Sequence, residues 1–212
     1  MQNAKELFQQ ALAEAMTPKE GWKPTILEDE CFIASSLVNP QEEKYRKLLH
    51  VGGGNIESST GQLQNLLTAE QEKLVSGKFL FDSSVVLYNK IRPYLRKLAR
   101  PDFSGLCSAD MYPLMPKAKN SRDFLFFLLL TDNFTNYANK HSARAGMPKL
   151  NRESLFAYPF AIPDSAEQQN IADKLDKLFD IGQQMQAQHD EISTDCDELK
   201  KAILTKAFAG EL

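Results

Sequence analysis

The residues with the clearest chemical potential are cations grouped between positions 78 and 100. Six Lys and Arg lie there against one carboxylate, Asp82. Pro93 is not tolerated in the interior of a helix, so this segment is expected to be extended. Such a chain suits a phosphate backbone and leaves side chains for base edges. The residues predicted to form this DNA face are Lys90, Arg92, Tyr94, Arg96 and Lys97. A charged edge strand that contacts only solvent is the open alternative.

A second basic loop lies at residues 146–151, with the sequence Gly-Met-Pro-Lys-Leu-Asn. Lys149 and Asn151 are two positions apart, which places both on one side of an extended chain. Asn can read adenine through two hydrogen bonds, and Lys can reach guanine or a phosphate. Both are therefore predicted to contact DNA, although an ordinary surface loop has the same composition. The residues that flank this loop are Lys140, His141, Arg144 and Arg152.

A glycine-rich turn follows a short apolar stretch at residues 50–56. Its three consecutive glycines, Gly52 to Gly54, resemble a phosphate loop. The Gly-Lys-Ser/Thr ending that holds nucleotide phosphates and magnesium is absent, so a strand that runs into a turn is favoured. Free backbone N–H groups in such a turn could still meet a DNA phosphate.

The sequence offers no constellation for catalysis. His50, His141 and His189 are far apart, and no Cys or carboxylate cluster has metal-ligand spacing. Nucleophile signatures and the Asn/Asp-Pro-Pro-aromatic signature of amino-methyltransferases are absent. We therefore predict a non-catalytic chain without a metal or cofactor of its own. The alternative is an enzyme whose site these signatures do not reveal. In that case, changing an isolated residue such as His141 would abolish an activity.

Charge is distributed unevenly along the 212 residues, whose net charge is −3. Residues 17–165 carry nineteen Lys and Arg against sixteen Asp and Glu, whereas residues 166–212 carry five Lys against ten Asp and Glu. A mildly basic middle permits DNA binding, and the acidic end suits protein partners. The three scattered cysteines are expected to be buried in a reducing compartment. The sequence has neither the apolar core of a signal peptide nor an apolar run long enough to span a bilayer. A cytoplasmic protein with no membrane partner is therefore predicted.

The elements that position these residues follow from the hydrophobic pattern. Residues 121–139 are predicted to form one helix capped by Ser121, and residues 146–163 a loop and a short strand. The fold class is therefore α+β, with a long helix appended. Strands are predicted at 26–27, 31–33, 48–51, 79–81, 85–88 and 106–114.

The long helix is expected over residues 166–208, at a length of roughly 60 Å. Its apolar residues recur at spacings of four and three, the pattern of a coiled-coil seam. A helix with one narrow apolar stripe needs a partner helix, or it folds back on its own domain. A short amphipathic helix over residues 4–16 is predicted to pair with it. The seam consists of Ile171, Leu175, Leu178, Met185, Ile192, Leu199 and Ile203.

Taken together, these motifs resemble the DNA-specificity subunit of type I restriction-modification systems. The resemblance covers nearly the whole chain, and the order and spacing of its motifs agree with that family. Four stretches carry it: residues 50–61, residues 86–97, residues 146–169 and residues 199–212.

The resemblance implies three parts: a conserved-region helix at 1–16, a target-recognition domain at 17–165 and a long conserved-region helix at 166–212. Family members usually carry two recognition domains and two long helices, so this chain resembles a half-size subunit. Two copies would then pair through their long helices and read a split, palindromic target. Pairing with a different half subunit, and a fragment of a longer subunit, are the open alternatives.

The resemblance also implies partners. A specificity subunit delivers a methyltransferase subunit, which uses S-adenosylmethionine on adenine, and a restriction subunit that combines a motor and a nuclease. A partner subunit is expected to contact Glu167, Gln168 and Gln169. Double-stranded DNA is expected to bind at the basic residues named above. The alternative is a non-catalytic coiled-coil adaptor that dimerises without sequence-specific DNA binding.

Overall fold

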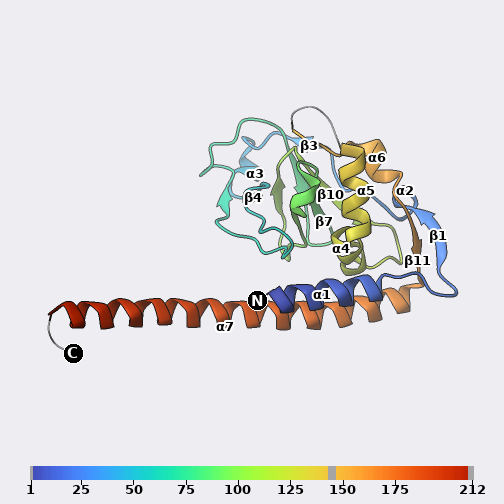
Figure 1. Ribbon diagram of the computed structural model, residues 1–212. Coiled ribbons are helices and arrows are strands. Elements are labelled where there is room, and N and C mark those ends of the chain that lie inside the picture. The colour runs from blue at the N-terminus through green and yellow to red at the C-terminus, as the bar shows by residue number, and fades with distance from the viewer. Residues whose placement is uncertain (1, 143–146, 210–212) are drawn as a thin grey trace. The chain divides into compact units, whose positions relative to one another are not determined.

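The computed structural model describes residues 2–142 and 147–209 (Figure 1). The chain divides into two compact units, one formed by Met1–Ala15 with Asp173–Leu212 and the other by Met16–Ala172. The sequence analysis placed the end of the DNA-binding domain at residue 165. The larger unit continues about two helical turns beyond that residue, to Ala172. Those two turns contain Gln168, Ile171 and Ala172, which are buried.

Three sheets form the larger unit. β1 (Lys23–Ile26) and β11 (Pro159–Ile162) pair antiparallel. The four-stranded sheet has the order β2 (Cys31–Ile33), β10 (Met111–Pro116), β7 (Val86–Asn89) and β8 (Leu98–Ala99). The five-stranded sheet has the order β3 (Leu37–Val38), β6 (Lys78–Phe81), β9 (Gly105–Cys107), β4 (Leu49–Val51) and β5 (Leu67–Thr68). Its β4 and β9 are parallel, whereas its other pairs are antiparallel.

Short helices complete this unit. They are α2 (Leu27–Glu30), α3 (Glu43–Arg46), the 3₁₀ helix η1 (Pro93–Leu95), α4 (Arg122–Leu130), α5 (Asp132–Ser142) and α6 (Arg152–Phe156). The main apolar core joins the two larger sheets, with Phe79 and Phe81 from one and Leu87 and Met111 from the other. The α+β class predicted from the sequence is confirmed.

The predicted helix over 121–139 is two helices. Ser121 caps α4 as expected, because its hydroxyl accepts a hydrogen bond from the Phe124 N–H at 3.2 Å. The break falls at Thr131, whose hydroxyl donates to the Leu128 carbonyl at 2.7 Å and accepts from the Phe134 N–H at 3.2 Å. A threonine hydroxyl competes with the backbone for helical hydrogen bonds, so one side chain ends α4 and starts α5.

The predicted strand over 106–114 is also wrong as a single element. β9 and β10 belong to different sheets. A turn at Ser108 separates them, where the Met111 N–H donates to the Ser108 carbonyl at 2.9 Å and the Asp110 N–H donates to the Ser108 hydroxyl at 3.2 Å. The strands predicted at 31–33, 48–51, 79–81 and 85–88 are confirmed within a residue, whereas residue 27 of the predicted 26–27 strand begins α2.

The smaller unit contains two helices, α1 (Gln2–Ala15) and the 45-residue α7 (Ser165–Ala209), whose first two turns belong to the larger unit. α1 runs antiparallel beside α7 (Figure 1). The rings of Phe8 and Phe179 meet edge to face with centroids 5.1 Å apart. The predicted pairing of a short N-terminal helix with the long helix is confirmed. The Asp164 carboxylate accepts a hydrogen bond from the Glu167 N–H at 2.9 Å, which caps α7 at its start.

Cys31 and Cys107 are buried, but Cys196 is exposed. The expectation of three buried cysteines was therefore wrong for Cys196, which lies on α7 between the exposed seam residues Ile192 and Leu199. Among the described residues, no helix combines the length and hydropathy needed to cross a membrane.

Gly105 of β9 lies close to both neighbouring strands, β4 and β6. A Cβ there would lie 2.7 Å from the Leu49 carbonyl oxygen and 2.9 Å from the Phe81 ring. We expect Gly105→Ala to lower the free energy of unfolding by roughly 1–3 kcal/mol, the usual cost of overpacking. The matched control is Gly54→Ala, where a Cβ meets nothing within 4 Å. Thermal melts of the full chain measure both, at about 2–4 °C per kcal/mol; equal melting temperatures for the two variants would contradict the prediction.

Candidate nucleic-acid interface

The basic segment after β7 turns sharply around η1. Pro93 is buried, and the residues on either side of the 3₁₀ turn are left-handed, Arg92 with φ +50° and Arg96 with φ +47°. Such backbone costs of order 1–3 kcal/mol per non-glycine residue and is concentrated at functional sites. The segment predicted to be extended is therefore a tight turn, with Tyr94 54% exposed at its tip.

The two basic stretches form one surface. Ile91 pairs with Lys149 in an antiparallel bridge. The Arg92 N–H donates to the Pro148 carbonyl at 2.9 Å, and the Leu150 N–H donates to the Lys90 carbonyl at 3.0 Å. Backbone hydrogen bonds thus join segments that the sequence predicted separately. Gly146 and Arg144, at the start of the second basic loop, lie outside the described residues.

Lys90 is held inside this surface and is only 8% exposed. Its Nζ donates to the Ala109 carbonyl at 2.5 Å, lies 3.9 Å from the Asp110 carboxylate and sits 4.8 Å from the centre of the Tyr112 ring. Burial lowers the pKa of Lys90, and the nearby charge of Lys149 lowers it further. These contacts give Lys90 a structural role between β7 and β10, and a contact with DNA at this residue stays a prediction.

The other cations of the surface are more accessible. Arg92 is exposed and has no ion pair among the described residues. Arg96 pairs with Asp132 at the start of α5, and Lys97 donates to the Gly53 carbonyl at 2.6 Å. Lys149 is about half exposed, 3.7 Å from the Asp110 carboxylate. Asp110 therefore faces two lysines, an arrangement that the sequence analysis missed because it placed Asp110 inside a strand.

Asn151 has a local role that competes with base reading. Its Oδ1 accepts a hydrogen bond from the Ser154 N–H at 2.7 Å, which caps α6. Leu150 is fully buried, so Lys149 and Asn151 do lie on the same, outer side of that residue. The loop and short strand predicted over 146–163 therefore missed α6, which this asparagine caps.

The glycine-rich turn lies against the same surface. A Cβ on Gly53 would lie 2.7 Å from the Asn89 side chain, which explains a glycine there. Its carbonyl accepts the hydrogen bond from Lys97. The turn therefore supports the basic segment through Gly53, and its role toward DNA is indirect in this arrangement.

The three residues expected to contact a partner subunit differ in their surroundings. Gln168 is 2% exposed, and its amide accepts from the Ser121 N–H at 2.9 Å and donates to the Pro163 carbonyl at 3.0 Å. Glu167 accepts a hydrogen bond from the Trp22 indole at 3.1 Å. Gln169 is exposed. Gln168 thus fixes the first turn of α7 to the cap of α4, and a partner contact stays a prediction for all three.

The seam residues also separate into two groups. Ile171 and Leu175 are at most 4% exposed. The remaining members are 44–62% exposed: Leu178, Met185, Ile192, Leu199 and Ile203. The stripe is therefore uncovered over most of α7. Among the described residues, no group of three or more His, Cys, Asp and Glu is placed to hold a metal ion.

The fold and the site define a class: a sheet-based domain with a basic face, continued by a long helix that carries an apolar stripe. The chain belongs to the family of type I restriction modification DNA specificity domains, whose model matches residues 44–193. It is 36% identical over 180 residues to the EcoDI specificity subunit, a type I restriction enzyme subunit of Escherichia coli, covering 85% of this chain and 40% of that protein. It is 28% identical over 112 residues to the StySPI specificity subunit of Salmonella potsdam, covering 52% of this chain and 24% of that protein. The chain thus spans less than half the length of both relatives.

Solved structures share the fold. A chain from a study of complex assembly and conformational transition of the type I R-M system matches the whole chain with a TM-score of 0.74 at 19% identity, over 53% of its own length. The HsdS subunit from Thermoanaerobacter tengcongensis matches it with a TM-score of 0.65 at 18% identity, over 52% of its length. In each case this chain corresponds to about half of the structure.

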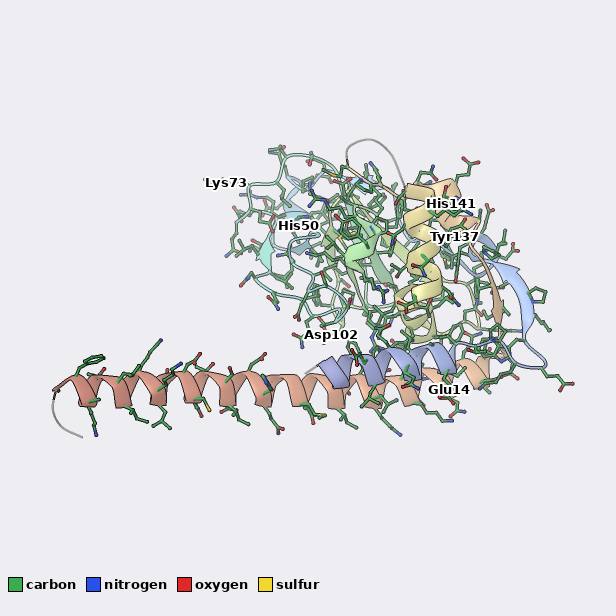
Figure 2. All side chains as sticks on the ribbon, in the orientation of Figure 1. Glu14, His50, Lys73, Asp102, Tyr137 and His141 are labelled. Atoms are coloured by element: carbon green, nitrogen blue, oxygen red, sulfur yellow. The ribbon has the colours of Figure 1, made fainter. Side chains whose placement is uncertain are left out.

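The exposed cations of this surface generate a prediction about salt dependence. Replacing both Arg92 and Lys149 by Ala should weaken binding to any duplex DNA and flatten the plot of log affinity against log salt by about one unit per lost phosphate contact. Fluorescence anisotropy with a labelled duplex between low and moderate salt measures this slope. The matched control is Lys73→Ala, an exposed lysine that Figure 2 shows at the opposite side of the domain from His141 and Tyr137 of α5. An equal effect of the control would remove the argument for a localised DNA face.

Proposed function

We propose that this chain is a DNA-sequence specificity subunit that reads one half of a split target for a type I restriction-modification complex. Adenine methylation and restriction would be performed by partner subunits, so the chain contributes recognition and no chemistry. The observation that supports this proposal best is the backbone pairing of residues 90–92 with 148–150, because it gathers the basic stretches onto one face in a member of the specificity family.

The proposed role of the basic face is to position the domain on the DNA backbone. Arg92, Lys97 and Lys149 would contact phosphates, which carry no sequence information but fix orientation and register. Tyr94 and Arg96, from the same turn, would approach the bases. Main-chain hydrogen bonds from Arg92 to Pro148 and from Arg96 to Pro93 hold this turn in one shape, so little ordering entropy would be lost on binding.

The counter-charges on this face suggest that one copy binds DNA weakly. Asp110 faces Lys90 and Lys149, and Asp132 pairs with Arg96, so part of the positive charge is already compensated. Each compensated cation releases fewer counterions when it meets a phosphate. Joining two copies would make the second binding event intramolecular and raise the overall affinity without new contacts.

The uncovered stripe on α7 supports such a pair. Its exposed members continue to Ile203, which is 49% exposed. A monomer that leaves a long apolar stripe in water presents an interaction site, and the heptad spacing selects another helix as its partner. In the proposed dimer, two identical reading faces are related by a two-fold axis, so the target is an inverted repeat with a spacer. Pairing with a different half subunit would give two unlike half-sites.

The dimer generates a prediction for the stripe. Changing Leu178 and Ile192 to Asp should make the chain monomeric, because unpaired charges in an apolar seam are costly to bury. The matched control places Asp at Ala187 and Thr194, which are exposed and lie on the outer side of the same helix by heptad position. Light scattering of the purified chain gives the mass of each variant. A seam variant that stays dimeric would exclude pairing through this stripe.

A methylation map tests the proposed function as a whole. The chain is expressed with its methyltransferase subunit in a host without adenine methylation, and modified adenines are read across the genome. We expect a split palindromic motif. An asymmetric split motif would retain the reading role and indicate a second half subunit, whereas no methylation from a well-expressed complex would favour a coiled-coil adaptor.

A further inference from the structure

Residues 55–64 form a small hairpin that hydrophobic patterning did not predict. Ile56 and Leu63 make an antiparallel bridge, the Gln64 N–H donates to the Asn55 carbonyl at 2.8 Å, and the Glu57 N–H donates to the Gln62 carbonyl at 2.9 Å. Ile56 is 1% exposed, and Leu63 packs against the main core. The two bridge residues therefore point inward and fix which side of the hairpin faces out.

The hairpin is anchored at both ends. At its base, the Asn55 side chain accepts a hydrogen bond from the Gly52 N–H at 2.9 Å and donates to the carbonyls of Gln64 and Asn65, each at 3.1 Å. At its turn, Gly61 has φ +69°, and a Cβ there would lie 3.1 Å from the Leu98 carbonyl oxygen. The turn therefore packs closely against β8, and hydrogen bonds fix the hairpin at its base.

The same hairpin adjoins the basic turn. The Ser59 N–H donates to the Arg96 carbonyl at 3.1 Å, so the backbone of the hairpin is bonded to the residue that ends η1. The glycine turn that leads into the hairpin is bonded to Lys97. A nucleic acid held by the basic face would therefore lie within reach of the hairpin.

The outer side of the hairpin carries amides. Side chains alternate along a strand, so the residues on either side of the inward Leu63 point outward, and both Gln62 and Gln64 are exposed. The only carboxylate of the hairpin, Glu57, accepts a hydrogen bond from the Thr60 hydroxyl at 2.9 Å. A glutamine amide can donate to and accept from adenine in the major groove, which admits a two-stranded ribbon.

We propose that the hairpin 55–64 reads bases, and that Gln64 sets the preference for one adenine of the half-site. This inference rests on the proposed function and deepens it. Gln64 is the better placed glutamine because its N–H and its carbonyl are both bonded to Asn55, which fixes the direction of its side chain. The basic face then supplies affinity, and the hairpin supplies part of the sequence preference.

The test is a selection from a pool of randomised duplex DNA, with the full chain in complex with its methyltransferase subunit. Gln64→Ala should relax the preference at a single position by roughly tenfold and leave binding to non-specific DNA unchanged. Gln64→Glu should shift that position from adenine toward cytosine, because a carboxylate accepts from the cytosine amino group but cannot donate to adenine. The matched control is Gln41→Ala, an exposed glutamine on a different loop.

The outcomes separate the two proposals. If the unchanged chain enriches a motif and both Gln64 variants enrich the same motif, the base-reading role of Gln64 is overturned while the proposed function stands. A uniform loss of binding to all sequences by the variants, with an unchanged melting temperature, also overturns it in favour of a phosphate contact. If the unchanged chain enriches no motif, the proposed function itself fails, and the role of Gln64 fails with it.

Discussion

The backbone pairing of residues 90–92 with 148–150 is the constraint on which the surface depends. Three segments far apart in the sequence meet there: the turn around η1, the loop before α6 and, through Lys97, the glycine turn after β4. None of these segments is part of a regular sheet at that point, so the pairing lacks the repeated hydrogen bonds of a strand ladder. The bridge at Ile91 joins the two basic segments, and the buried Lys90 ammonium bonds the first of them to the Ala109 carbonyl.

The long helix presents a different physical problem. Its first turns are held by buried contacts, with Gln168 bonded to the cap of α4 and Ile171 in the apolar interior. Farther along, the apolar stripe is exposed. A solitary helix of this kind gains little from its side chains, since burial of an apolar face provides most helical stability in proteins. The energetic gain from covering this stripe is therefore available to a partner, which is consistent with the proposed dimer.

The sequence predicted the local features of this chain well and the long-range ones poorly. Heptad spacing located α7 to within a residue at each end, because this signal acts over a few positions. The burial of Lys90 was not predictable in the same way, since its partners Ala109 and Asp110 come from a turn between strands of different sheets. The break at Thr131 was missed because apolar periodicity continues across it, and one hydroxyl decides the outcome. The hairpin 55–64 has a single pair of inward apolar residues, too few to show an alternation.

A main-chain hydrogen bond from Ser59 to Arg96 joins the hairpin to the basic turn, and another from Arg92 to Pro148 joins the basic turn to the second basic loop. Main-chain bonds do not depend on which side chain a position carries. The outward residues of these loops can therefore be exchanged while the framework keeps its shape, provided that the anchors Asn55, Gly61 and Lys90 are retained. A scaffold of this kind separates the stability of the domain from the identity of the proposed reading residues, so under the proposed function new specificities would arise by substitution at the outward positions alone.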